Sequence, residues 1–324
     1  MTKISLQNAF DSYFHNKYLF DDFLNLDISK QYKKIFHSKN TFSPEIKLKK
    51  YQQFLNIFIF DFLEINRDVV FSYIKGVNNY DAVFPHRDSK YIFTTDIKSF
   101  FLNINEDKIR QLIIDNKTNF LIKEIDIEKY IDTLINLVTY NGILPIGAPT
   151  SPKISNAYLL EFDNIIQEYC LEKDIIYTRY SDDFIFSSED KSIFDDLLIE
   201  IKSVFVALGF DSFLLNEDKT KIQTRGEQRV VLGLSITPNG HITVEKKMKK
   251  NIETLFHFYL TDKSKYKDFL SKKYIPNNSK STSLDKVSGH LNYIKSIDTK
   301  FIKHLKHKYG NYLVNSFIDR SINE

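Results

Sequence analysis

Two adjacent carboxylates, Asp182 and Asp183, are the residues in this sequence best suited to chemistry. They lie between two short apolar runs, 175–177 and 184–186, whose β-branched and aromatic residues predict two strands. Ser181 and the aspartates favour a tight turn between them. Neighbouring ionised carboxylates repel each other, and hard divalent cations such as Mg²⁺ bind to oxygen ligands. The pattern predicts a hairpin with a cation site at its tip, although an isolated Asp-Asp pair is more often a solvated turn.

Four further segments extend this pattern along the chain. Asp96 ends the apolar run 91–95, and a loop marked by Gly and Pro spans 142–152. Two more segments follow the hairpin, at 215–222 and 231–236. In their order, these segments resemble motifs A to E of reverse transcriptases. The resemblance is strongest to bacterial retron and defence-associated, abortive-infection-like enzymes.

The resemblance implies a nucleotidyltransferase, an RNA-directed DNA polymerase that uses two Mg²⁺ ions or Mn²⁺. Two-metal phosphoryl transfer needs ligands shared between ions about 4 Å apart. In the family's pattern, Asp96 and Asp182 bridge both ions, Asp183 assists, and the main-chain carbonyl of Ile97 is a further ligand. One ion lowers the pKa of the primer 3′-hydroxyl, and the other neutralises the triphosphate and the leaving pyrophosphate.

The resemblance also assigns residues around the incoming nucleotide. Phe101 matches the steric gate, whose ring clashes with a 2′-hydroxyl and so selects deoxynucleotides. Gly147 lets the backbone approach the nucleotide closely. Ile146 departs from the Gln of many members and can only pack, which weakens the expectation of ordinary nucleotide handling and templating fidelity. Lys33, in a short basic hairpin, best matches the lysine that contacts the triphosphate, although a solvated basic loop explains it equally well.

Other residues match positions that act on the leaving group and the primer. Lys219 matches the motif D lysine that can protonate the departing pyrophosphate, although a charged surface turn explains it as well. The segment 231–236 matches the primer grip, with Leu232, Gly233 and Leu234 as its central residues.

Nucleic-acid binding is assigned to two regions. Ser151 begins a helix after the Gly147 loop and lies where the family lines its nucleotide and template pocket. Lys246 and Lys250 belong to a lysine-rich C-terminal part, which would follow the phosphates of an RNA–DNA hybrid with salt-dependent affinity.

The predicted fold class is α+β: a right-hand polymerase with fingers, an RRM-like palm built on an antiparallel sheet, and a helical thumb. We expect N-terminal helices and fingers over 1–90, the palm with interleaved fingers helices over 91–244, and the basic helical thumb over 245–324. Helical spacing of apolar residues supports helices in the first 80 residues and in the thumb. A connector rich in Asn and Ser is expected at 276–281.

Within the palm, periodicity and punctuation predict several elements. Helices are expected over 105–140, 151–173 and 192–208, the last one ended by Gly209. A strand is expected over 230–236, followed by a turn at 238–240 into a second strand over 241–244.

The composition limits the class of protein. Hydrophobic residues make up 42% of the 324 residues, which is enough for a buried core. The single cysteine, Cys170, excludes intrachain disulfides and suits a reducing, cytoplasmic location. We expect no membrane partner, because the sequence has no signal-like segment and no apolar run of about 18 residues. The formal net charge is only +3, so nucleic-acid binding depends on local patches.

The resemblance implies an RNA template or a structured noncoding RNA, a DNA product and dNTPs as partners, together with an effector protein in anti-phage defence. Two alternatives stay open. Ile146 and short fingers favour a template-independent or protein-primed DNA polymerase of the abortive-infection type. The other alternative is a catalytically silent RNA-binding scaffold, which would not need three intact carboxylates. The sequence does not identify the RNA, the priming group, the effector or the oligomeric state.

Overall fold

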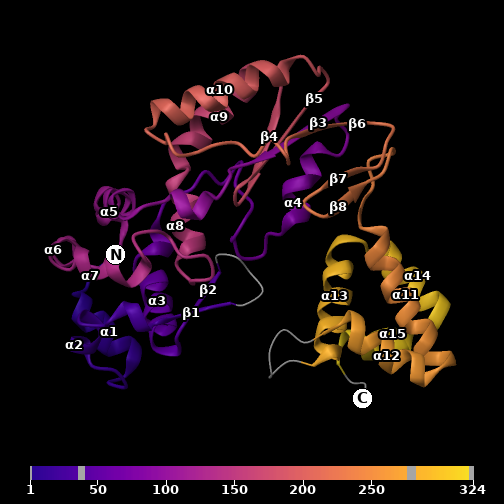
Figure 1. Cartoon of the computed structure of the whole chain (residues 1–324), viewed down its shortest axis with the longest axis horizontal. Helices are drawn as coiled ribbons and strands as arrows, with labels where there is room; N and C mark the ends of the chain where they lie inside the picture. The colour runs from indigo at the N-terminus through magenta and orange to yellow at the C-terminus, as the bar shows by residue number, and fades with distance from the viewer. Residues whose placement is uncertain (1, 36–40, 276–281, 321–324) are drawn as a thin grey trace. The chain divides into compact units, whose positions relative to one another are not determined.

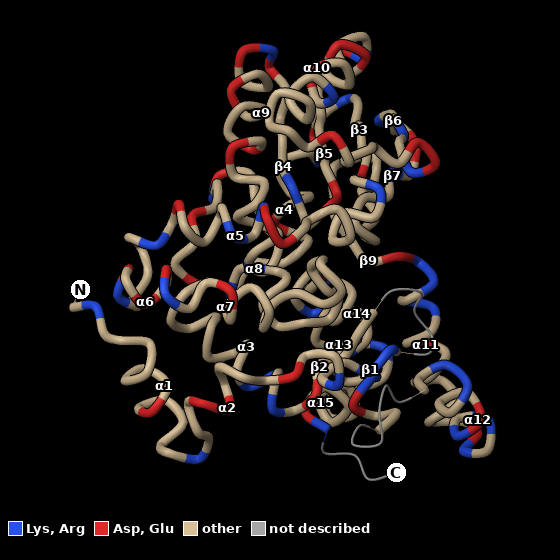
Figure 2. Tube along the Cα trace, turned by 60° about the vertical axis from the view of Figure 1, so that its left-hand side comes forward, with Lys and Arg blue, Asp and Glu red and all other residues tan. Residues whose placement is uncertain are grey.

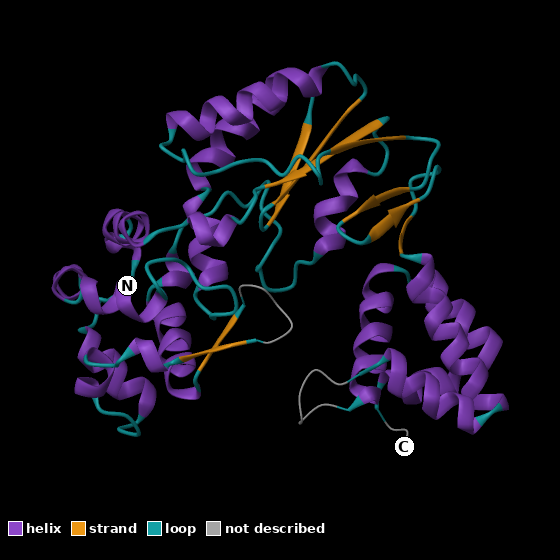
Figure 3. Cartoon of the chain, in the orientation of Figure 1, coloured by secondary structure: helices purple, strands orange, loops and turns teal. Residues whose placement is uncertain are grey.

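A computed structural model of the chain describes residues 2–35, 41–275 and 282–320 (Figure 1). It divides into two compact units, each with helices and strands (Figure 3). The first unit comprises Met1–Ala82 and Tyr91–Ile222, and the second comprises Val83–Lys90 and Gln223–Glu324. The α+β class is therefore confirmed, whereas the division into 1–90, 91–244 and 245–324 stays a prediction.

The first unit contains three strands of a four-stranded sheet in the order β4-β5-β3-β6, and the boundary between the units falls within β6. The strands of this sheet are β3 (Tyr91–Asp96), β4 (Ile176–Tyr180), β5 (Asp183–Ser188) and β6 (Lys221–Thr224). β5 pairs antiparallel with both β3 and β4. The predicted hairpin on either side of Ser181 and Asp182 is confirmed.

One face of this sheet is aromatic and lies against two helices. Side chains alternate between the faces of a strand, so Phe184 shares this face with Phe93, which is one strand away. The ring of Phe162 lies 5.2 Å from that of Phe184, and the ring of Phe194 lies 5.3 Å from that of Phe93. These two rings come from α9 (Leu160–Glu172) and α10 (Ile193–Ala207), which Figure 1 shows along the sheet.

Helices occupy fewer than half of the described residues before β3, so the prediction of a mostly helical segment is only partly confirmed. Helices α1 (Leu6–Phe14), α2 (Phe20–Leu24) and α3 (Ile46–Phe58) pack their aromatic rings together, and the short α4 (Asn79–Val83) follows. The predicted basic hairpin is confirmed, with β1 (Tyr32–Lys34) antiparallel to β2 (Phe42–Pro44). Most of the link between these strands lies outside the described residues.

The predicted helices of 105–173 are present but divided. They are α5 (Glu106–Asp115), α6 (Glu124–Lys129), α7 (Ile131–Val138) and α8 (Ser151–Tyr158), with α9 following after Leu159. α10 agrees with the helix expected over 192–208, and Gly209 follows it with a positive φ of 65°.

The second unit joins a small sheet to a helical region. Its strands are β7 (Arg229–Val231), β8 (Leu234–Ile236) and β9 (Ile242–Val244), in the order β7-β8-β9. The prediction of a single strand over 230–236 is wrong, because Leu232 and Gly233 have φ of 49° and 74° and turn the chain between β7 and β8. Two successive positive φ values are typical of the tightest hairpin turns. The predicted pairing of the next strand, β9, with β8 is confirmed.

Helices fill the rest of the second unit, as the sequence predicted. They are α11 (Lys246–Thr261), α12 (Lys263–Lys273), α13 (Ser283–Ile297), α14 (Thr299–Tyr309) and α15 (Asn311–Ile318). Figure 2 shows the lysines that gather along α11 and α12. The predicted connector at 276–281 lies outside the described residues. Across the described part of the chain, every helix is too short or too polar to span a bilayer.

Candidate active site

Asp96 and Asp183 face each other across two neighbouring strands. They are direct partners in the antiparallel pair of β3 and β5, and residues directly opposite each other point to the same face. This face is the one away from α9 and α10, because Asp183 immediately precedes Phe184. The N–H of Ile97 donates a hydrogen bond of 3.2 Å to the carbonyl of Asp182. The structure therefore brings the three predicted carboxylates and Ile97 to one end of the central strands β3 and β5.

The turn before the two aspartates has an unusual backbone. Ser181 has a φ of 61°, a left-handed conformation that is uncommon for a residue with a side chain. Its hydroxyl lies 2.9 Å from the hydroxyl of Tyr73. Nothing in the sequence had pointed to Tyr73, which is 108 positions away from its partner.

The segment that carries Lys219 is attached to the end of β3. The N–H of Asn216 donates to the carbonyl of Asp96 at 2.8 Å, and the hydroxyls of Thr95 and Thr220 lie 2.7 Å apart. These contacts place the ammonium of Lys219 2.8 Å from Oδ2 of Asp96. The predicted motif D lysine thus pairs directly with one of the predicted carboxylates.

Burial and electrostatic repulsion both disfavour ionisation of Asp182 and Asp183. Burial raises the pKa of Asp183 to about 6, and the charges of Asp182 and Asp96 contribute to the rise. Burial also raises the pKa of Asp182, with a further contribution from Asp96. The hydrogen bond with Asp96 raises the pKa of Lys219 above its usual range. A cation at this end of the strands would relieve the repulsion.

The donor atoms suit a hard divalent ion. Oδ1 of Asp96 is buried and makes no hydrogen bond with the described residues. Carboxylate and carbonyl oxygens are the ligands that Mg²⁺ prefers. No three His, Cys, Asp or Glu side chains in the described ranges converge into a ready-made metal-binding group, and Lys219 contacts the other oxygen of Asp96. The donor chemistry fits Mg²⁺, but the side chains must draw together to bind it.

The two candidate gate residues differ in burial. Phe100 is 1% exposed, whereas Phe101 is only partly buried against the core. This agrees with the choice of Phe101 for the gate. Its contact with a nucleotide stays a prediction.

The loop before α8 packs against the β1–β2 hairpin. Gly147 has a φ of 107°, and a Cβ on it would lie 2.4 Å from the carbonyl oxygen of Phe42. The carbonyl of Ile146 accepts a hydrogen bond of 2.8 Å from the N–H of Phe42. Ser151 is buried, and its hydroxyl donates to the carbonyl of Pro145 at 2.6 Å. In this arrangement Gly147 and Ser151 shape the loop, and their predicted contacts with nucleotide or template are untested.

The remaining predicted site residues belong to other elements. Lys33 is exposed on β1 and pairs with Glu45 at 2.5 Å. The other residues belong to the second unit: Leu232 and Gly233 form the β7–β8 turn, Leu234 begins β8, and Lys246 and Lys250 are exposed on α11. Their roles stay predictions.

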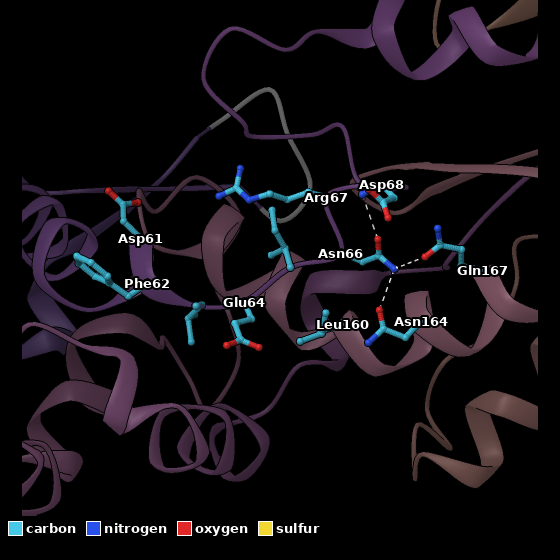
Figure 4. A pocket seen from close by; sticks show the side chains of 11 residues that line it. Asp61, Phe62, Glu64, Asn66, Arg67, Asp68, Leu160, Asn164 and Gln167 are labelled. Atoms are coloured by element: carbon cyan, nitrogen blue, oxygen red, sulfur yellow. Dashed lines mark hydrogen bonds between the residues drawn. The ribbon is translucent and has the colours of Figure 1, made fainter.

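A polar pocket of about 550 Å³ opens beside α9 (Figure 4). The side-chain amide of Asn66 donates hydrogen bonds to Asn164 at 2.8 Å and to Gln167 at 2.7 Å. The pocket is lined by the loop 61–68 and by α9, and it contains none of the predicted site residues.

Comparisons with known proteins agree on one family. The family model described as "Reverse transcriptase (RNA-dependent DNA polymerase)" matches residues 28–236. The Retron Ec83 reverse transcriptase of Escherichia coli is 24% identical over 251 residues, covering 77% of this chain and 76% of its own length. The Retron Ec73 reverse transcriptase of Escherichia coli is 28% identical over 279 residues, which cover 84% of this chain and 83% of its own length.

Solved structures give a more distant likeness. The apo telomerase from Candida tropicalis is 14% identical with a TM-score of 0.45, and the match covers 84% of this chain. The chain spans about half of that telomerase, since the match covers 51% of it.

Proposed function

This chain belongs to the reverse transcriptase family of RNA-dependent DNA polymerases, and we propose that Asp96, Asp182 and Asp183 carry the polymerase reaction by a two-metal mechanism. The observation that supports this assignment best is the direct pairing of Asp96 with Asp183 across β3 and β5, with Asp182 in the adjoining turn. The raised pKa values of Asp182 and Asp183 are those of a site that gains from bound positive charge.

Each residue of the proposed site has a defined task. Asp96 offers its unbonded Oδ1 as a ligand, Asp182 and Asp183 supply further oxygens, and the carbonyl of Ile97 completes the set. When bound, two Mg²⁺ ions would supply charge neutralisation for the triphosphate and activation of the primer hydroxyl. Lys219, which contacts Asp96 in this structure, would donate a proton from its ammonium to the leaving pyrophosphate. Phe101 excludes the 2′-hydroxyl of a ribonucleotide.

The template is proposed to be a structured noncoding RNA that is copied into DNA. This rests on the likeness to retron reverse transcriptases. A role in anti-phage defence beside an effector protein is proposed with it. The lysines of α11 and α12 supply a basic surface for nucleic acid.

The test is DNA synthesis by the purified chain with Mg²⁺, labelled dNTPs and a primed RNA template. Asp182→Ala/Asp183→Ala should reduce incorporation by about a hundredfold or more, the scale expected when a preorganised electrostatic group is lost. The matched control is Asp195→Ala/Asp196→Ala, another adjacent pair, which is exposed on α10 and should keep wild-type activity. Undiminished synthesis by the first variant would refute the metal assignment.

A second experiment tests the template. The chain is purified with its bound nucleic acid and given labelled dNTPs with or without RNase treatment. Loss of synthesis after RNase, with a product complementary to the co-purified RNA, supports the retron-like function. Synthesis that survives RNase and gives protein-linked or simple-sequence DNA would favour the untemplated, protein-primed alternative. A wild-type chain that binds RNA tightly without incorporating any dNTP would favour the scaffold.

A further inference from the structure

A fully buried ion pair lies next to the turn that carries Asp182. Arg179 of β4 and Asp163 of α9 are both 0% exposed. The guanidinium of Arg179 donates two hydrogen bonds to the carboxylate of Asp163, from Nε to Oδ1 at 2.8 Å and from Nη2 to Oδ2 at 2.6 Å. Burying two charges costs solvation energy that their attraction often does not recover, so such a pair is weak evidence for stability alone.

The guanidinium also holds the turn itself. Nη1 of Arg179 donates to the carbonyl of Ser181 at 2.9 Å and to Oδ1 of Asn156 at 3.1 Å. Nη2 donates to the carbonyl of Asn156 at 3.2 Å. An Arg side chain has donors fixed in a planar fork, so binding Asp163 on one side sets the direction of the donor that meets Ser181.

Arg179 lies on the opposite face of the sheet from Asp183. It pairs with Phe184 across β4 and β5, so its side chain points toward α9. Asp183 and Asp96 point to the other face. Arg179 therefore points away from the face that carries these carboxylates, and its direct contact with the turn is the hydrogen bond to the carbonyl of Ser181.

The backbone at both ends of this contact is constrained. The N–H of Arg179 donates to the carbonyl of Val69 at 2.7 Å, and its carbonyl accepts from the N–H of Phe71 at 3.0 Å. Ser181 has the uncommon φ of 61°, which the hydrogen bond to its carbonyl helps to maintain. The residue that follows this held carbonyl is Asp182.

The same network reaches the helix after the Gly147 loop. Asn156 belongs to α8, and its side-chain amide donates to the carbonyl of Ser72 at 2.8 Å. One guanidinium therefore contacts both α8 and the carboxylate turn.

We propose that Arg179, held by Asp163, is a positioning residue that fixes the Ser181 carbonyl and thereby the turn that presents Asp182 and Asp183. Its effect on catalysis rests on the proposed function. Its effect on the turn rests on the geometry alone.

The test is Arg179→Lys, which keeps the charge but cannot bind Asp163 and the Ser181 carbonyl with one planar fork. Amide hydrogen exchange at Asp182 and Asp183 should rise by about tenfold, as expected when a local hydrogen bond is lost. The kcat for dNTP incorporation should fall by about ten- to a hundredfold, the scale of a small misplacement of catalytic groups, with little change in KM. Mn²⁺ should also bind more weakly in the absence of nucleotide.

Tyr177→Phe is the matched control. It removes the hydrogen bond of 2.8 Å from Tyr177 to Oδ1 of Asp163, in the same buried network, but leaves the contact with Ser181. This variant should keep wild-type exchange at the turn and wild-type kcat. A merely structural role predicts instead that both variants lose thermal stability without a change in turn exchange or kcat, and that result would overturn the proposal.

Asp163→Asn keeps the proposal testable if Arg179→Lys does not fold. It preserves the shape of the side chain but removes the charge that binds the guanidinium. Amide hydrogen exchange at Asp182 and Asp183 should therefore rise and kcat should fall, each by a smaller factor than in Arg179→Lys. Wild-type values of both would overturn the proposal. A wild-type chain without polymerase activity would refute the proposed function, and the exchange measurement alone would then decide whether Arg179 holds the turn.

Discussion

The ammonium of Lys219 lies 2.8 Å from Oδ2 of Asp96, one of the proposed metal ligands. The contact joins the end of β3 to a residue 123 positions later in the chain. It gives the site one internal positive charge against three carboxylates, so Lys219 and a divalent ion compete for Asp96.

Lys219→Met should therefore separate metal binding from catalysis. Mn²⁺ binding without nucleotide should strengthen, because the competing ammonium is gone. The polymerisation rate should fall by about a hundredfold if the lysine acts as general acid. Titration calorimetry and single-turnover kinetics measure the two effects, and Lys221→Met, on the neighbouring strand β6, is the control. If Lys221→Met slowed polymerisation while Lys219→Met kept the wild-type rate, Lys221 and not Lys219 would be the general acid.

The raised pKa of Asp183 predicts a pH-dependent stability in the presence of chelator. Its pKa rises from about 4 in an unfolded chain to about 6 when folded. Because the folded state holds this proton more tightly, the free energy of unfolding should fall as the pH rises from about 4 to about 6. Asp183→Asn should remove this loss and stabilise the chain at pH 7.5 by about 1 kcal/mol, a figure reduced for solvent screening.

Urea unfolding at pH 5 and pH 7.5 measures this effect. Asp195→Asn, on the exposed face of α10, is the control and should follow the wild type. Equal stability of Asp183→Asn and the wild type at pH 7.5 would show that neither burial nor repulsion makes the ionised Asp183 side chain costly to the folded state.

The local elements around the site could be predicted from the sequence because their signals are local. Apolar runs on either side of Asp182 and Asp183 indicate two strands, and the aspartates indicate the turn. The strand ending in Asp96 is equally clear. Their pairing in register required the motif order, since alternation alone does not say which strands are neighbours.

The structural features that the sequence did not predict depend on contacts between distant residues or on an unusual backbone conformation. Leu232 adopts a positive φ that its residue type disfavours, so the turn between β7 and β8 was predicted as strand. Arg179 and Asp163 meet across 16 positions inside the core, where charged residues are rare, and neither residue type marks such a pair. Tyr73 reaches Ser181 only because the chain between them folds back.

The partial burial of Phe101 predicts a test of sugar selectivity. Phe101→Ala should lower the preference for dNTPs over rNTPs by about a hundredfold, because a ring that clashes with the 2′-hydroxyl is removed. Phe100→Leu is the control, since Phe100 lies in the core and a smaller apolar side chain there should lower stability but leave selectivity unchanged. Incorporation of each nucleotide in separate and competing reactions gives the ratio. Unaltered selectivity in Phe101→Ala would exclude Phe101 as the gate.

Gly147 and Gly142 form a natural pair for testing the close approach of the loop to β2. Both have positive φ, at 107° and 77°, but only a Cβ on Gly147 would clash, at 2.4 Å from the carbonyl oxygen of Phe42. Gly142→Ala should cost about 1 kcal/mol in unfolding free energy, the strain of the left-handed backbone alone. Gly147→Ala should cost more than that, because backbone rather than a flexible side chain must move, and its KM for dNTPs should rise. Urea unfolding and steady-state kinetics of both variants provide the comparison, and equal effects of the two substitutions would mean that the contact with Phe42 does not constrain the loop.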